Sequence, residues 1–134
     1  MQDIPINWWA VLAVVALKFV LGFVWFGLLF GKQWQALSGL TEAQMKAGMP
    51  KAIVTDVAMN FVMAWVLVHA VRYAGATTWP MGAGVGFFNW LGFVGALSLS
   101  GTVYGNRSLK LWALQNAYEC IALVAMGAIL AVWS

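Results

Sequence analysis

Four long apolar stretches constrain the fold of this chain more than any other feature of its sequence. A helix needs about 20 mostly apolar residues to cross about 30 Å of hydrocarbon at about 1.5 Å per residue. Only 8% of the 134 residues are charged, whereas about 25% are charged in an average soluble domain. We therefore expect an all-α fold, an integral membrane four-helix bundle, with spans at about residues 8–30, 52–71, 81–103 and 109–133.

Other classes of structure fit the sequence poorly. A membrane β-barrel would show alternating segments of about ten residues, but the apolar runs here are continuous and longer. Residues 1–7 contain no Lys or Arg, which argues against a cleaved signal peptide. The connections between the apolar stretches leave no room for a soluble domain, so residues 1–134 are predicted to form a single transmembrane domain.

The positive charges predict how the bundle is oriented. With four spans, both termini lie on one side of the membrane. The only Lys or Arg predicted on that side is Arg72. The short loops on the opposite side carry Lys32, Lys46, Lys51, Arg107 and Lys110. Because short cytoplasmic loops are enriched in Lys and Arg, we predict that both termini lie outside the cytoplasm. The net charge of +3 follows from this topology, and no basic stripe indicates a nucleic-acid partner.

One connection is long enough to contain a helix of its own. Thr41 and Gln44 have the spacing of a capping box. They predict a short helix from about residue 42 to 48, which would stop before Pro50.

Two charged residues fall at the depth where the bilayer is most apolar. Lys18 and Glu119 each lie ten residues into a span, entering from opposite faces, so both are about 15 Å deep. A charge at this depth costs about 2.5–3.5 kcal/mol on insertion scales. We expect the two side chains to pair inside the bundle, because pairing removes much of this cost.

The remaining polar residues at mid-depth predict a polar core shared by all four helices. Two interpretations of this core are open. Its hydrogen bonds could serve only to fix helix register, or it could form a proton or substrate site in which Glu119 titrates and Lys18 is its counter-ion. Besides Lys18 and Glu119, the members of the predicted core are Asn60, Asn89, Asn116, Asp56 and Gln115.

Glycines at GxxxG spacing predict close helix packing. Without a hydrophobic drive between helices in lipid, close backbone approach is what favours association. Glycine is most frequent in the third span, which we expect either at the bundle centre or at the interface of a homo-oligomer. The helix-packing pairs are Gly27–Gly31, Gly82–Gly86 and Gly101–Gly105.

No metal site, cofactor site or known catalytic set is predicted. His69 is the only histidine, and the single cysteine, Cys120, is predicted on another helix. A membrane enzyme would have to build its site from Lys18, Glu119, Asp56 and Tyr118.

Two sets of short motifs resemble those of the bacterial domain of unknown function 1761. In the first half they are Asn7-Trp8, Phe19-x-x-Gly22-x-x-Trp25-Phe26, Phe30-Gly31-Lys32-x-Trp34 and Gly39-Leu40-Thr41. In the second half they are Trp90-Leu91-Gly92-Phe93, Leu109-x-Leu111, Asn116-x-Tyr118 and Met126-Gly127-Ala128-Ile129-Leu130. The resemblance implies a four-helix bacterial membrane protein, and we expect a multi-pass protein of the bacterial inner (plasma) membrane. It implies no activity and no functional residues.

Three functions remain compatible with the sequence. The leading one is a small transporter, a channel or a membrane-embedded small-molecule binding protein that uses the polar core. The second is a structural or accessory subunit of a larger membrane complex, and the third is a membrane enzyme. The expected partners are the lipid bilayer, further copies of the chain, and a small-molecule or ion ligand.

Overall fold

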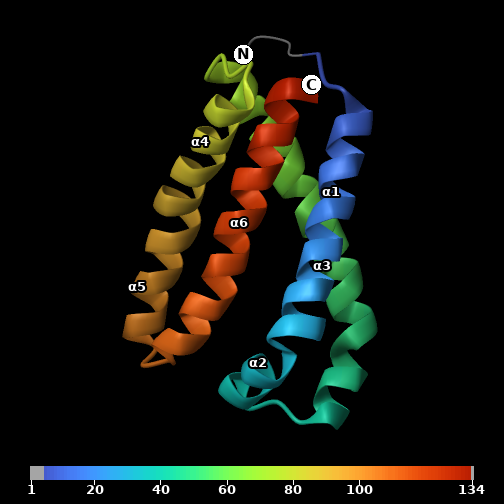
Figure 1. Cartoon of the computed structure of the whole chain (residues 1–134). Coiled ribbons are helices and arrows are strands. Elements are labelled where there is room, and N and C mark those ends of the chain that lie inside the picture. Colours follow the sequence, from blue (N-terminus) through green and yellow to red (C-terminus); the bar gives the residue numbers. More distant parts are fainter. Residues whose placement is uncertain (1–4, 134) are drawn as a thin grey trace.

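The computed structural model describes residues 5–133, and every regular element within them is helical (Figure 1). Four helices are long and apolar enough to span a membrane: Trp8–Leu29, Glu42–Tyr73, Trp79–Tyr104 and Leu109–Trp133. The prediction of an all-α membrane bundle is therefore confirmed. The elements are α1 (Trp8–Phe23), the π-helical segment η1 (Val24–Leu29), α2 (Gly31–Ser38), α3 (Glu42–Tyr73), α4 (Trp79–Asn89), the π-helical segment η2 (Trp90–Gly95), α5 (Ala96–Tyr104) and α6 (Leu109–Trp133).

The connection between the first two spans differs most from its prediction. The capping box is confirmed, since Gln44 N donates to Thr41 Oγ1 at 3.1 Å and Thr41 N donates to Gln44 Oε1 at 2.9 Å. The prediction that this helix stops before Pro50 is wrong, because α3 continues through Pro50 to Tyr73. Proline removes one backbone hydrogen bond and crowds the preceding turn. Pro50 and its neighbours are exposed, so water or lipid headgroups can solvate the carbonyl that loses its donor.

The same connection contains α2, which the sequence did not predict. This helix ends at Gly39, whose φ of +74° is the left-handed conformation that suits glycine at a helix C-terminus. Figure 1 shows α2 at the opposite end of the bundle from the first and last described residues.

Helix α6 occupies the centre of the bundle. It contacts α1, α3, α4 and α5, and it is the most buried of the four spans. In Figure 1, α4 and α5 lie on one side of α6, and α1 and α3 lie on the other. The alternative that placed the third span at the bundle centre is therefore wrong. The third span is the least buried one, because its contacts are concentrated on a single neighbour, α6.

The two ends of the described chain meet at one end of the bundle. Asn7 caps α1 by accepting from Trp9 N, and its side-chain amide donates to Trp133 O at 3.2 Å. An even number of spans produces this arrangement. The predicted domain and topology include residues 1–4 and 134. These residues lie outside the described part of the chain.

The contact between α4 and α6 is the most extensive helix contact in the bundle. A Cβ atom on Gly82 would collide with the carbonyl oxygen of Gly127, and one on Gly86 would collide with that of Leu123. Glycine is therefore required at both positions for the two backbones to approach this closely. We call this contact the α4–α6 seam.

The other predicted packing glycines have no such contact within the described chain. A Cβ atom on Gly27, Gly31 or Gly105 would meet only residues close in sequence, and one on Gly101 would meet nothing within 4 Å. The structure thus assigns interhelical packing to one of the three glycine pairs, Gly82–Gly86. A role for the others between copies of the chain stays a prediction.

Candidate mid-membrane site

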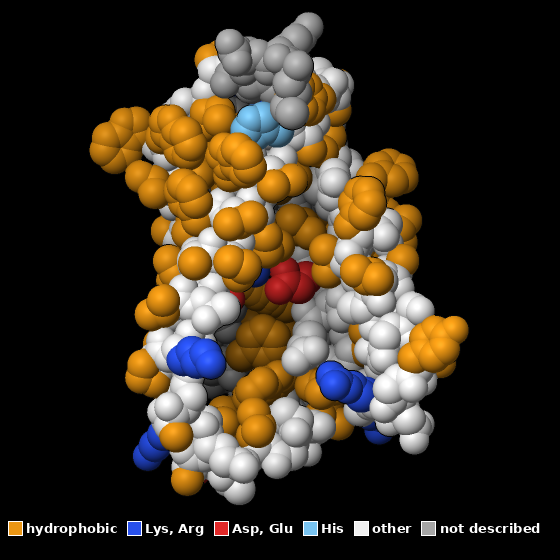
Figure 2. All heavy atoms as spheres, turned by 180° about the vertical axis from the view of Figure 1, so that it is seen from behind, with side chains coloured by type: hydrophobic (Ala, Val, Ile, Leu, Met, Phe, Trp, Pro, Cys, Tyr) orange, Lys and Arg blue, Asp and Glu red, His pale blue; other side chains and the backbone are white. Residues whose placement is uncertain are grey.

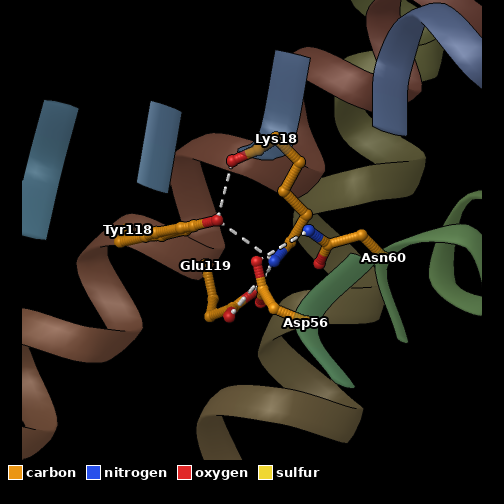
Figure 3. A network of polar contacts seen from close by, with 5 residues as sticks. All are labelled: Lys18, Asp56, Asn60, Tyr118 and Glu119. Carbon is orange, nitrogen blue, oxygen red and sulfur yellow. Dashed lines mark hydrogen bonds and ion pairs between the residues drawn. The ribbon is translucent and has the colours of Figure 1, made fainter. Parts of the chain in front are cut away.

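Lys18 is the centre of a polar cluster formed by α1, α3 and α6 (Figure 3). Its side chain is only 2% exposed, yet its ammonium has several oxygen partners on α6. Lys18 Nζ lies 3.3 Å from Glu119 Oε2 and 3.4 Å from Glu119 Oε1. It also donates to Tyr118 Oη at 3.2 Å. The depth argument brought Lys18 and Glu119 to the same level, and the structure places them in contact.

Tyr118 connects α6 to both the side chain and the backbone of Lys18. Its hydroxyl donates to Lys18 O at 2.9 Å while its oxygen accepts from Lys18 Nζ. The ammonium also lies 4.7 Å from the centre of the phenol ring, within cation–π range. Gly22, one turn after Lys18, leaves room for this hydroxyl, because a Cβ atom there would lie 3.0 Å from Tyr118 Oη.

Helix α3 contributes Asp56 and Asn60 to the cluster. They are four residues apart and share a helix face, and Asn60 Nδ2 donates to Asp56 Oδ2 at 3.2 Å. Asn60 is buried and Asp56 is exposed. Figure 3 shows the Asp56 carboxylate pointing toward Lys18 and Glu119.

The other predicted core residues do not join this cluster. Asn89 donates to Val85 O within its own helix, and Gln115 is exposed on α6. Asn116 accepts from Ser98 Oγ on α5 at 3.0 Å and donates to Trp112 O at 2.9 Å. Asn116 and Tyr118 are two residues apart, so their side chains point in directions about 160° apart around α6. The single predicted core is therefore replaced by a charged cluster and a separate α5–α6 contact.

The charged cluster opens into a hollow on one face of the molecule. Figure 2 shows acidic side chains at mid-height in this hollow, with Lys and Arg side chains toward its lower end. The Glu119 side chain is 31% exposed, in contrast to that of Lys18 behind it. On the α3 side, a pocket of about 450 Å³ is lined by Gly48, Lys51, Ala52, Thr55, Asp56 and Met59.

Aromatic rings lie beside the cluster, toward α2. Phe26 stacks on Tyr118 with ring centres 5.2 Å apart and meets Trp34 of α2 edge-on at 6.1 Å. Trp25 donates its indole N–H to Leu114 O of α6 at 3.0 Å. Both Trp25 and Phe26 belong to η1. Single π-helical turns within α-helices often occur at functional sites, and here the turn brings two neighbouring rings to α6.

The cluster contains one more carboxylate than ammonium groups. Lys18 contributes one positive charge, and Asp56 and Glu119 contribute two negative charges when ionised. Glu119 Oε2 is shielded from solvent. Among the described residues, it forms the ion-pair contact with Lys18 and accepts no hydrogen bond. No group of three or more His, Cys, Asp or Glu side chains within residues 5–133 is placed to hold a metal ion.

These features define the class of protein: an integral membrane protein of four spans with charged groups between its helices. The family model described as "Protein of unknown function (DUF1761)" matches residues 9–131, and the chain belongs to this family. The family resemblance noted in the sequence is thus confirmed. No curated protein and no solved structure matches the chain.

Sequence reasoning gave Tyr118 no place in the polar core. The sequence indicated this tyrosine only as a residue that a membrane enzyme could use and as part of a motif that resembles the family. Its position next to Glu119 and the presence of Gly22 four residues after Lys18 are the available signals, but neither shows that the two helices face each other at this point.

Proposed function

We propose that this protein is a small transporter, a channel or a membrane-embedded small-molecule binding protein whose site is the cluster of Lys18, Asp56 and Glu119. One observation carries the proposal: the charged groups border an open hollow instead of being sealed in a dry core. Glu119 is 31% exposed although it pairs with a Lys18 that is 2% exposed. A pair that served only to fix helix register would be stabilised by complete enclosure and full hydrogen bonding.

The free energy needed to bury a charge in a membrane supports the presence of water or a polar solute in the hollow. Hydrocarbon against Asp56 and Glu119 would leave them without solvation, at about 2.5–3.5 kcal/mol for a charge at the midplane. Water or a polar solute removes this cost. Lys51, which lines the same pocket as Asp56, is five residues or about 7.5 Å nearer the end of the bundle. The pocket therefore extends from Asp56 toward that end of the bundle, with Lys51 and Thr55 as its other polar side chains.

The setting of the site follows from the charge distribution and the exposed glycines. We propose that the protein lies in the bacterial inner (plasma) membrane, with the end of the hollow that carries Lys and Arg side chains on the cytoplasmic side and both termini outside. Gly92 and Gly101 of the third span are exposed and have nothing within 4 Å of an added Cβ atom. These open positions support a homo-oligomer in which further copies of the chain, along with lipid, are the partners of the third span.

A cysteine-labelling experiment tests whether the hollow is open to solutes. In a Cys120→Ala background, Asp56→Cys is compared with Ala64→Cys, which lies two turns further along α3 in the buried core. A charged, membrane-impermeant thiol reagent is added to inside-out vesicles. We expect labelling at position 56 and none at position 64. Absence of labelling at 56, with labelling after denaturation, would contradict a solute-accessible site.

Ligand binding is tested by thermal stability in mild detergent. Wild type, Glu119→Gln and the matched control Glu42→Gln are melted with a panel of inorganic ions and small organic solutes. Glu42 is an exposed carboxylate in the first turn of α3, outside the cluster. We expect a solute that stabilises wild type and Glu42→Gln but not Glu119→Gln. If no solute stabilises wild type and Glu119→Gln leaves melting unchanged, an accessory subunit is the better description.

A further inference from the structure

We infer that the hollow binds an organic cation, specifically a monovalent ammonium compound that carries apolar groups. This inference rests on the proposed function, because it names the class of ligand for the same site. It is argued from the charges of the cluster, from the way Lys18 is held, and from the side chains that border the hollow.

The charge balance of the cluster favours a cation. Two carboxylates, Asp56 and Glu119, accompany a single ammonium, that of Lys18 (Figure 3). Away from bulk water, an unmatched carboxylate is costly unless it is paired. A monovalent cation brings the cluster to neutrality, whereas an anion would take it to two excess negative charges.

The coordination of Lys18 shows what this site offers an ammonium group. Lys18 Nζ is held by the Glu119 carboxylate, by the phenol oxygen of Tyr118 at 3.2 Å and by the face of the same ring at 4.7 Å. Within residues 5–133, Asp56 accepts one hydrogen bond, from Asn60, although an ionised carboxylate offers about four acceptor positions. The carboxylate lines the pocket on the α3 side of the hollow, so a second ammonium can approach it from there.

Apolar side chains next to the carboxylates favour an organic cation over a small metal ion. Met59 lines the pocket together with Asp56. The half-buried ring of Phe26 stacks on Tyr118, whose own ring faces the Lys18 ammonium. Figure 2 shows hydrophobic side chains deep in the hollow next to the acidic ones. Aromatic faces attract cations by about 0.5–2 kcal/mol and make van der Waals contact with alkyl groups. A divalent ion instead needs more oxygen ligands than this cluster provides.

The basic side chains near the mouth do not reverse this preference. Lys51 is the basic residue that lines the pocket, and it lies about one and a half helical turns from Asp56. It is therefore nearer the headgroup region than the cluster is, and a long lysine side chain at that level extends toward the headgroups, where anionic lipids attract it.

The test uses three probes of similar size and different charge: benzyltrimethylammonium, the neutral N-benzylacetamide and the anion benzenesulfonate. Binding to the full chain in detergent is measured by calorimetry for wild type, Asp56→Asn, Glu119→Gln and the control Glu42→Gln. We expect the cation to bind at least about tenfold more tightly than either other probe. Asp56→Asn and Glu119→Gln should each weaken its binding by about tenfold or more, while Glu42→Gln should not change it.

Melting temperatures recorded for each variant separate lost binding from lost folding. Asp56→Asn is the safer variant because position 56 is exposed and an asparagine oxygen can still accept from Asn60. Equal affinity for the three probes, tighter binding of the anion, or cation binding that Asp56→Asn leaves unchanged would each overturn the inference.

The outcomes also separate the inference from the proposed function. If the neutral or anionic probe binds and Glu119→Gln abolishes that binding, the site stands and its cation preference is wrong. If no probe binds but Asp56→Cys is labelled, the hollow is open to solutes and the inference of an organic cation is again wrong. If no probe binds and Asp56→Cys is not labelled, both proposals fail.

Discussion

The α4–α6 seam and the charged cluster both depend on α6, but they are built from opposite kinds of contact. At the seam, Gly82 and Gly86 let backbone meet backbone, with carbonyl groups of α6 where a side chain would otherwise be. At the cluster, polar side chains from α1, α3 and α6 lie between the helices (Figure 3), and part of the space beside them stays open (Figure 2).

The difference shows how a small bundle can keep an open polar site. Tight packing in lipid is driven by van der Waals contact, and the seam supplies it along α4 without any charged group. Packing at the other side of α6 is relaxed, so Glu119 remains 31% exposed. The seam should therefore respond to added volume, and the cluster should respond to a change in charge.

The largest effect is expected when the cluster loses its ammonium. Lys18→Met keeps most of the side-chain volume but leaves Asp56 and Glu119 without a positive partner. Removing one member of a buried pair costs about 3–5 kcal/mol, and we expect about 3 kcal/mol because Glu119 is partly exposed. The free energy of unfolding in detergent, measured by titration with a denaturing detergent, checks this value.

The matched control is Lys32→Met, which removes an exposed lysine of α2. Its effect should be close to zero. The double variant Lys18→Met/Glu119→Gln should recover part of the loss, because the uncompensated charge is reduced. Equal losses for Lys18→Met and Lys32→Met would show that the cluster is solvated like the surface.

The seam is tested by adding a single methyl group. Gly86→Ala places its Cβ atom against the Leu123 carbonyl, so the helices must separate, and overpacking of this kind costs about 2 kcal/mol. Gly84→Ala on the same helix has open space, and it should be neutral or stabilising by about 0.5–1 kcal/mol because alanine favours helix. Thermal unfolding of both variants checks the contrast. Similar melting temperatures for the two would mean that the backbones are not in close contact.

The spans were predictable because the length of an apolar run is set by the thickness of the bilayer. The fourth span agrees with its predicted range, and the first differs by one residue. The start of α3 was predictable from Thr41 and Gln44, since a capping box is a local signal. Its continuation through Pro50 was not, because tolerance of a proline depends on what solvates the carbonyl left without a donor.

The site was only partly predictable for a similar reason. Depth depends on position along a helix, so Lys18 and Glu119 could be placed at one level. Which face of a helix meets which neighbour depends on packing, so Asn89 and Asn116 were assigned to a cluster that they do not join. The π-helical segments η1 and η2 change the facing of the residues that follow them, and no local sequence signal marked either one.

The smallest effect is expected for Tyr118→Phe. This variant tests whether the stability of the cluster depends on its ion pair alone or also on the geometry of its hydrogen bonds. Phenylalanine keeps the ring that stacks on Phe26 and faces the ammonium, and it loses only the hydroxyl. Lys18 keeps its ion pair with Glu119, so the loss should be that of the two hydrogen bonds of the hydroxyl, from Lys18 Nζ and to Lys18 O, about 1.5 kcal/mol together. Tyr104→Phe, at a 91% exposed tyrosine of α5, should have no effect. If Tyr118→Phe is instead as damaging as Lys18→Met, the hydroxyl that joins Lys18 Nζ to Lys18 O holds the ammonium in place. Geometry would then matter as much in the cluster as it does at the seam.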